Sequence, residues 1–295
     1  MNRMQATAIG FMAVLLWALL ALFTVGSAPT PPLLLNTLAF GIGGIVGLVW
    51  AIATKSLDRM RQVPLRVYIF GTLGLFAYHL LYFSALRLAP AAEAGLIAYL
   101  WPLLIVIFSG LLPGEQLRAG HIIGAVLGFA GAALIITGGG TRFGSASLTG
   151  YLLALMAAFT WGSYSVLSRR VSEAPTASVA IFCLGTSALS LPLHLFFEQT
   201  VLPSTTLGWA SIAGLGLGPV GFAFYVWDIG CKKGDIQLLG TSSYAAPLLS
   251  TLVLITVGVA APSMTLLWAA LLITGGAAIA ARTSLKQTSA NSTNG

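Results

Sequence analysis

Ten long apolar runs follow one another along the chain, and short polar gaps separate them. The runs cover residues 5–26, 32–53, 66–87, 91–112, 119–138, 148–168, 176–197, 205–230, 237–258 and 263–281. Each is close to the ~20 residues that an α-helix needs to cross about 30 Å of hydrocarbon. The runs do not alternate between polar and apolar residues as transmembrane β-strands do. The pattern therefore predicts an all-α integral membrane protein with ten transmembrane helices.

The composition agrees with a lipid environment. Of the 295 residues, 57% are hydrophobic and 7% are charged, and the mean hydropathy is +0.93, whereas a soluble domain carries roughly 25% charged residues. The net charge is +7, but nucleic-acid binding needs basic residues clustered on one soluble face. Here they lie in the gaps between apolar runs, so we expect the lipid bilayer and not a nucleic acid as partner.

The basic residues divide unevenly between the two sides of the expected membrane. With the N-terminus inside, the cytoplasmic gaps contain Arg3, Lys55, Arg59, Arg61, Arg66, Arg118, Arg169, Arg170, Lys232, Lys233, Arg282 and Lys286, and the outer gaps contain Arg87 and Arg142. Lys and Arg resist translocation, so the asymmetry predicts that both termini are cytoplasmic. The polar segment 282–295 is expected to be a disordered tail. The first run has the flanks of a signal peptide, but nine later spans favour a retained helix.

Two halves of the chain, 5–138 and 148–281, are related. The segment Gly95-Leu-Ile-Ala-Tyr-Leu-Trp-Pro-Leu-Leu104 recurs 145 residues later as Gly240-Thr-Ser-Ser-Tyr-Ala-Ala-Pro-Leu-Leu249, with five of ten positions identical. Each half holds five spans, and because five is odd, the second half enters the membrane from the opposite side. We therefore expect two inverted five-helix repeats, which in secondary transporters surround a site near the membrane midplane. The alternative is that duplication only enlarged a membrane scaffold.

Prolines interrupt the fourth and ninth spans at equivalent places. Pro102 cannot donate to the carbonyl of Ala98, and Pro247 likewise leaves the carbonyl of Ser243 without its helical partner. We expect both helices to kink there, with Pro102 and Pro247 as hinges. A freed carbonyl is tolerated in a membrane only where protein, water or solute covers it, which favours a cavity at the kinks. Taken alone, either proline is equally well explained as shaping the packing of its helix.

Aromatic and polar side chains in the middle of the spans are the candidate substrate-binding residues. They are Trp17, Tyr78, His79, Tyr82, Tyr99, Trp101, Trp161, Tyr164, Trp227, Ser243 and Tyr244. His79 and Tyr82 share a helix face, as do Tyr78 and Tyr82, and a polar face is costly against lipid. In a straight helix Tyr99 and Trp101 would point to opposite sides, and Tyr99 is the one expected to face inward. The competing interpretation is packing within the core or hydrogen bonding between helices.

Few charges lie within the spans. Glu93 is within reach of Arg87, and Asp228 precedes Lys232 by four residues, so ion pairing or snorkelling is expected for both carboxylates. Either is also a candidate carrier of a coupled proton. Glu115 is expected to anchor a loop or the start of the next helix.

Several motifs resemble a known family. The run from Ala89 through Glu93 to Ala94, the segment Tyr99-Leu-Trp-Pro102 and the pair Gly114-Glu115 resemble the EamA-type drug/metabolite transporter superfamily, over nearly the whole chain. The segment 78–83 and Tyr99–Pro102 are similar to the YddG branch, which exports aromatic amino acids and related compounds. The resemblance implies a bacterial inner membrane and a central cavity lined mainly by spans 1, 3, 4, 6, 8 and 9.

These observations predict a secondary transporter that exports small amphiphilic solutes, aromatic amino acids first, by alternating access through an aromatic-lined cavity. The alternatives are a multidrug or cationic-dye exporter and a non-transporting membrane receptor or scaffold. His79, His121 and His194 are isolated and form no zinc motif, and the sequence contains no phosphate-binding loop. We therefore expect no enzyme activity, no metal and no cofactor, and a chain that functions as a monomer.

Overall fold

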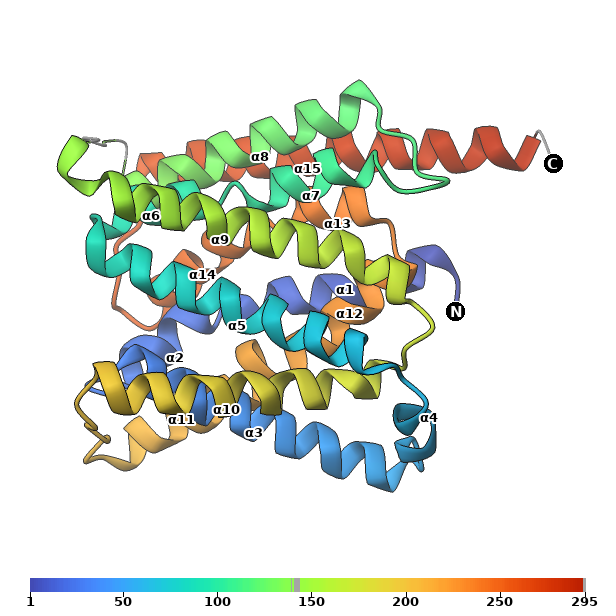
Figure 1. Cartoon of the computed structure of the whole chain (residues 1–295). Helices are drawn as coiled ribbons and strands as arrows, with labels where there is room; N and C mark the ends of the chain where they lie inside the picture. The colour runs from blue at the N-terminus through green and yellow to red at the C-terminus, as the bar shows by residue number, and fades with distance from the viewer. Residues whose placement is uncertain (139, 141–143, 294–295) are drawn as a thin grey trace.

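The computed structural model describes residues 1–138, 140 and 144–293, and every regular element in these residues is helical (Figure 1). Arg142, which the sequence places on the outer side, lies outside the described residues. Ten helical stretches are long and apolar enough to span a membrane: Arg3–Gly26, Pro32–Ala53, Leu65–Leu88, Ala91–Ser109, Ala119–Thr137, Leu148–Val171, Thr176–Phe197, Thr206–Lys233, Ile236–Thr256 and Met264–Lys286. The expected ten-helix fold is confirmed, with boundaries shifted by a few residues.

Six of these spans are built on one long helix each. These helices are α3 (Pro32–Ala53), α5 (Leu65–Leu88), α8 (Ala119–Thr137), α9 (Leu148–Leu167), α10 (Val179–Phe197) and α15 (Met264–Thr293). A short helix, α4 (Leu57–Arg61), connects the second and third spans. Unbroken helices suit these spans because nearly all their backbone hydrogen bonds are made within the segment. The exception is in α10, where Pro192 has no N–H to donate.

The other four spans are broken near their middle. Their parts are α1 (Arg3–Trp17) and α2 (Leu20–Gly26), α6 (Ala91–Ala98) and α7 (Trp101–Ser109), α11 (Thr206–Leu217) and α12 (Ala223–Lys233), and α13 (Ile236–Ser242) and α14 (Ala245–Thr256). The breaks before Pro102 and Pro247 confirm the predicted kinks. A π-helical segment, Gly218–Phe222, joins α11 to α12. The break between α1 and α2 was not predicted from the sequence.

The most extensive helix packing joins the two repeats. In Figure 1, α8 lies along α15 and α3 along α10, while α5 packs on α9 and α1 on α12. Exchanging the equivalent spans of the two repeats turns the pair α8–α15 into itself, and likewise the pair α3–α10. The same exchange turns the pair α5–α9 into the pair α1–α12. The packing therefore has the pseudo-twofold relation expected of two inverted five-helix repeats.

Glycines allow one of these helix pairs to approach closely. Where α1 crosses α12, a Cβ atom on Gly10 would lie 2.7 Å from the Cα of Gly230. Small residues at such crossings let two membrane helices gain van der Waals contact through their backbones. The pairing of α1 with α12 therefore depends on both glycines.

The last helix is longer than the sequence suggested. Instead of a disordered tail from residue 282, α15 continues to Thr293. Ser284 is 4% exposed, and its Oγ lies 3.3 Å from Nε2 of His121 on α8. This polar contact joins α15 to α8 just beyond Arg282.

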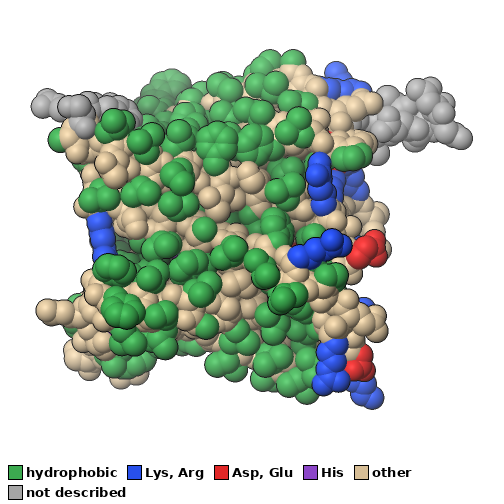
Figure 2. All heavy atoms as spheres, in the orientation of Figure 1, with side chains coloured by type: hydrophobic (Ala, Val, Ile, Leu, Met, Phe, Trp, Pro, Cys, Tyr) green, Lys and Arg blue, Asp and Glu red, His purple; other side chains and the backbone are tan. Residues whose placement is uncertain are grey.

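Charged side chains gather at one end of the molecule. On the face in Figure 2, most Lys and Arg side chains lie at the end where Figure 1 shows both termini, and hydrophobic side chains cover the middle. Exposed apolar side chains over the middle of a helical bundle are what a lipid-facing surface requires. The protein is therefore a multi-pass membrane protein.

Candidate solute-binding cavity

A cavity of about 130 Å³ lies where the broken first, fourth and eighth spans meet α5 and α9. Its lining residues are Trp17, Leu20, Tyr78, His79, Tyr82, Ala98, Tyr99, Trp101, Trp161, Pro219, Val220 and Phe224. Seven of the eleven predicted substrate-binding residues are in this set. The walls are thus mainly aromatic, with a few groups that form hydrogen bonds.

Trp17 is at the centre of the aromatic cluster. Its ring centroid lies 5.0 Å from that of Trp227, 5.9 Å from that of Trp101 and 6.1 Å from that of Trp161. Its Nε1 donates a hydrogen bond of 3.1 Å to the carbonyl of Pro219, in the π-helical segment. The irregular backbone of the eighth span therefore supplies the carbonyl that orients the tryptophan of the first span.

The side chains of α5 form one wall, as their spacing predicted. The rings of Tyr78 and Tyr82 are stacked, with centroids 6.0 Å apart, and that of His79 is 5.0 Å from Tyr78. Nδ1 of His79 lies 2.7 Å from the carbonyl oxygen of Leu75. Because a carbonyl only accepts, Nδ1 carries the proton, and in the neutral ring Nε2 is left as an acceptor.

The break between α6 and α7 turns both Tyr99 and Trp101 to the cavity. Their ring centroids are 6.2 Å apart. In a straight helix only one of the two would face it, so the inward direction of Trp101 follows from the break. In the described part of the chain, the hydroxyls of Tyr78, Tyr82 and Tyr99 have no protein hydrogen-bond partner, which leaves them available to a solute.

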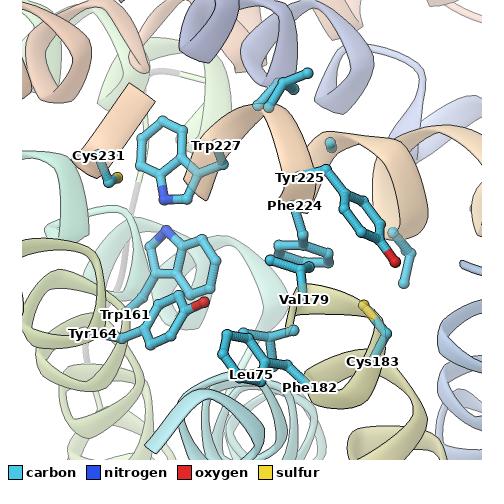
Figure 3. Packing of buried hydrophobic residues seen from close by; sticks show 14 of the residues in the cluster. Leu75, Trp161, Tyr164, Val179, Phe182, Cys183, Phe224, Tyr225, Trp227 and Cys231 are labelled. Carbon is cyan, nitrogen blue, oxygen red and sulfur yellow. The ribbon is translucent and has the colours of Figure 1, made fainter. Parts of the chain in front are cut away.

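Two further predicted residues pack behind the cavity wall. Trp227 is 2% exposed and donates from Nε1 to Oγ of Ser165 at 3.1 Å. Tyr164 is 6% exposed, and its ring packs 5.3 Å from that of Trp161. Figure 3 shows Tyr164 beside Trp161, with Trp227 facing them and Phe224 nearby. The structure therefore places Trp227 and Tyr164 in support of the wall and not in its lining.

Ser243 and Tyr244 also lie outside the cavity lining. Oγ of Ser243 donates to the carbonyl of Leu239 at 2.8 Å. The hydroxyl of Tyr244 accepts the backbone N–H of Leu103 at 3.0 Å. Both side chains satisfy backbone groups near the two helix breaks, so they stabilise the irregular backbone at Pro102 and Pro247.

Exposure changes from one end of the cavity to the other. Leu20, towards the end opposite the termini, is 40% exposed, whereas Trp161, towards the termini, is 3% exposed. Tyr82 and Tyr99 are half-buried. The lining residues are thus more accessible towards the end opposite the termini than towards the termini, where Trp161 is buried.

An ion-pair cluster lies beyond the tryptophans of the cavity, at the end with the termini. Glu115 pairs with Arg3 at 2.9 Å and with Arg169, and Arg3 lies 3.5 Å from Asp235. Nε of Arg169 also donates to the carbonyl of Cys231 at 2.9 Å. The sequence predicted only a loop anchor for Glu115. It missed the cluster because its members come from four distant segments. The only signal was the concentration of charges at one end of the spans.

The predicted ion pairs are partly confirmed. Lys232 pairs with Asp228 at 2.9 Å, as their spacing indicated. Arg87 pairs with Glu198 and not with Glu93, because Glu198 follows α10 and lies next to the C-terminal end of α5. Among the described residues, no group of three or more His, Cys, Asp or Glu side chains could hold a metal ion.

Two inverted helical repeats around an aromatic cavity define a membrane transporter of small solutes. Comparison with known families agrees. The chain belongs to the EamA-like transporter family, whose sequence model matches residues 5–137 and residues 148–282. The two matched stretches correspond closely to the two repeats.

Named relatives are similar to this protein over almost the whole chain. An aromatic amino acid exporter, YddG, of Ancylobacter novellus is 53% identical over 95% of this chain and 98% of its own. The protein of the same name from Escherichia coli K12 is 26% identical over 94% of this chain and 96% of its own. A solved crystal structure superposes with a TM-score of 0.90 at 52% identity, covering 95% of this chain and 98% of that chain.

Proposed function

We propose that this protein exports aromatic amino acids from the cytoplasm across a bacterial inner membrane by alternating access. The observation that carries the proposal is the aromatic-walled cavity beside the helix breaks. Its volume of about 130 Å³ is below the roughly 300–1,000 Å³ of pockets for drug-sized ligands. A small planar solute therefore fits the site better than a large drug does. The names of the relatives agree with this substrate class.

The two ends of an aromatic amino acid have matching groups in the wall. Its ring stacks on the indoles, and its ammonium group is attracted to aromatic faces and to the free Nε2 of His79. Its carboxylate accepts from the hydroxyls of Tyr82 and Tyr99. A cationic dye is a poorer match, because no Asp or Glu is among the described residues that line the cavity.

Alternating access requires the closed end to open. The ion pairs of Glu115 with Arg3 and Arg169 hold that end shut, and the helix breaks let half-helices move separately. The described conformation then corresponds to the state that releases solute outside. Since the whole cavity lies within one chain, a monomer suffices for transport.

The proposed direction depends on both termini being cytoplasmic. A reporter that is active only outside the cytoplasm should work when fused near Ser145 or Pro262 and should fail near Lys55, Arg170 or Lys233. Activity at Arg170 would overturn the proposed orientation.

Solute flux in liposomes tests the function itself. Purified protein should release trapped phenylalanine, tyrosine and tryptophan faster than leucine, and Tyr99→Ala should abolish most of this flux without loss of folded protein. Flux of cationic dyes without amino acid flux would favour the multidrug alternative. Absence of flux for every solute, with and without a pH gradient, would favour the receptor or scaffold.

A further inference from the structure

A second, larger pocket lies at the end of the molecule that holds the termini. It has a volume of about 930 Å³ and lies between the start of α5, the segment 170–176 and the end of α12. Its charged lining residues are Arg59, Arg66, Arg170, Lys232, Lys233 and Glu173. Among the described lining residues, five cations thus face a single carboxylate. Neither the aromatic cavity nor the ion-pair cluster uses this pocket.

Most of this positive charge is not compensated within the protein. Lys232 is the exception, since it is buried and pairs with Asp228 at 2.9 Å while donating to the carbonyl of Ala174. Arg66, Arg170 and Lys233 are exposed, and over residues 1–138, 140 and 144–293 none of them has an ion-pair partner. The basic pocket is therefore able to bind an anion.

An apolar groove continues from the basic pocket along the outside of the helices. It has a volume of about 530 Å³, and its walls include Met12, Val46, Trp50 and Tyr225. Thr176 and Ile229 line both the pocket and the groove, so the two are contiguous. Val46 is 48% exposed and Trp50 is 49% exposed, which places this groove on the lipid-facing surface. An anionic headgroup and an apolar chain can thus bind side by side.

We propose that the pocket and the groove form one binding site for an anionic phospholipid of the adjacent leaflet. The phosphate lies among Arg66, Arg170 and Lys233, whose guanidinium and ammonium groups suit phosphate oxygens. One acyl chain lies in the groove, with Trp50 at the level of the headgroup, where tryptophan is enriched in membrane proteins. A soluble anion would use only the basic pocket and would leave the apolar groove without an occupant.

Native mass spectrometry of the detergent-purified full chain tests the headgroup. Phosphatidylglycerol should bind more tightly than phosphatidylcholine with the same chains. The triple variant Arg66→Gln, Arg170→Gln, Lys233→Gln should bind phosphatidylglycerol about 100-fold more weakly, since each basic group contributes roughly fivefold. The matched control Arg61→Gln, Arg282→Gln, Lys286→Gln removes as much charge from the same end of the molecule and should leave binding unchanged.

A change in the groove tests the acyl chain separately. Val46→Trp fills the groove with an apolar side chain that a lipid-facing surface tolerates. It should remove the preference for dipalmitoyl over dihexanoyl phosphatidylglycerol. Equal binding of phosphatidylglycerol and phosphatidylcholine, or full affinity in the triple variant, would refute the proposal. Displacement of the lipid by an equal concentration of inorganic phosphate would also refute it, and would assign the pocket to a soluble anion.

Discussion

The fourth and ninth spans break at equivalent prolines, yet their equivalent tyrosines have different environments. Tyr99 lines the cavity, and among the described residues its hydroxyl has no protein partner. Tyr244 is 0% exposed, and its hydroxyl accepts the N–H of Leu103 at the other break. One tyrosine is thus available to a solute, while the other stabilises the helix that presents it.

A single glycine explains much of this difference. A Cβ atom on Gly128 of α8 would lie 2.6 Å from the ring of Tyr244, so the ring packs there only because the side chain is absent. The position 145 residues after Gly128 is Ile273, so the second repeat has a bulky side chain where the first repeat has none. An inverted repeat can keep its backbone break in both halves and still give the two tyrosines opposite roles.

The loops after the fourth and ninth spans also differ between the repeats, since only the first of them carries an ion-paired carboxylate. Glu115 follows α7 and joins Arg3 to Arg169. At the offset of 145, its counterpart is Ala260, which forms no ion pair. The first repeat thus has an ion-paired carboxylate in this loop, and the second repeat has none there. At the other end of the molecule the buried carboxylate is Glu198, at the end of α10, which pairs with Arg87.

The largest expected difference between the two tyrosines is in the effect of replacing each by alanine. Tyr244→Ala removes a buried aromatic ring and should lower the free energy of unfolding by about 3–5 kcal/mol. Thermal unfolding in detergent should show a large decrease in Tm. Tyr99→Ala should leave Tm nearly unchanged and reduce amino acid flux. Equal losses of Tm in the two variants would show that Tyr99 is a packing residue.

Glu115→Gln should weaken the closed end. It removes the charge that pairs with two arginines, and about 1.4 kcal/mol of lost stabilisation corresponds to tenfold more of the opened state. In a Cys183→Ser background, maleimide should therefore label Cys231, which is 1% exposed next to this cluster, roughly tenfold faster. Asp58→Asn removes an exposed pair and serves as the control. An unchanged labelling rate in Glu115→Gln would contradict the closing role.

Substitutions of His79 can distinguish a hydrogen-bonding role of its side chain from a proton-transfer role. Its Nδ1 already donates to Leu75, so its free nitrogen is an acceptor for the solute. His79→Ala should reduce flux about fivefold, the equivalent of one hydrogen bond of about 1 kcal/mol. His79→Gln should retain most of the flux over a range of pH. Loss of flux in both variants, with a wild-type pH dependence that both lack, would instead indicate a titrating role.

The sequence was sufficient for the ten spans and for the two prolines, because span length and a missing N–H are local properties. It also identified the wall on α5, since residues three and four apart share a helix face. It could not separate Tyr99 from Tyr244, whose local sequences match. Their difference arises from Gly128, a contact on another helix. The Glu115 cluster was missed for the same reason, because Arg3 and Arg169 reach it only in the folded chain.

The smallest expected effect comes from removing only the hydroxyl group of each tyrosine. Tyr244→Phe keeps the ring but leaves the N–H of Leu103 without its partner. Hydrogen bonds between membrane helices contribute about 0.6 kcal/mol on average, and up to about 1.7, so Tm should fall slightly and reproducibly. Tyr99→Phe leaves no protein group unpaired, so Tm should not change, while the KM for aromatic amino acids should rise if the hydroxyl binds the carboxylate. A decrease in Tm for Tyr99→Phe that equals the one for Tyr244→Phe would mean that both hydroxyls are structural, and the assignment of Tyr99 to the solute would then be wrong.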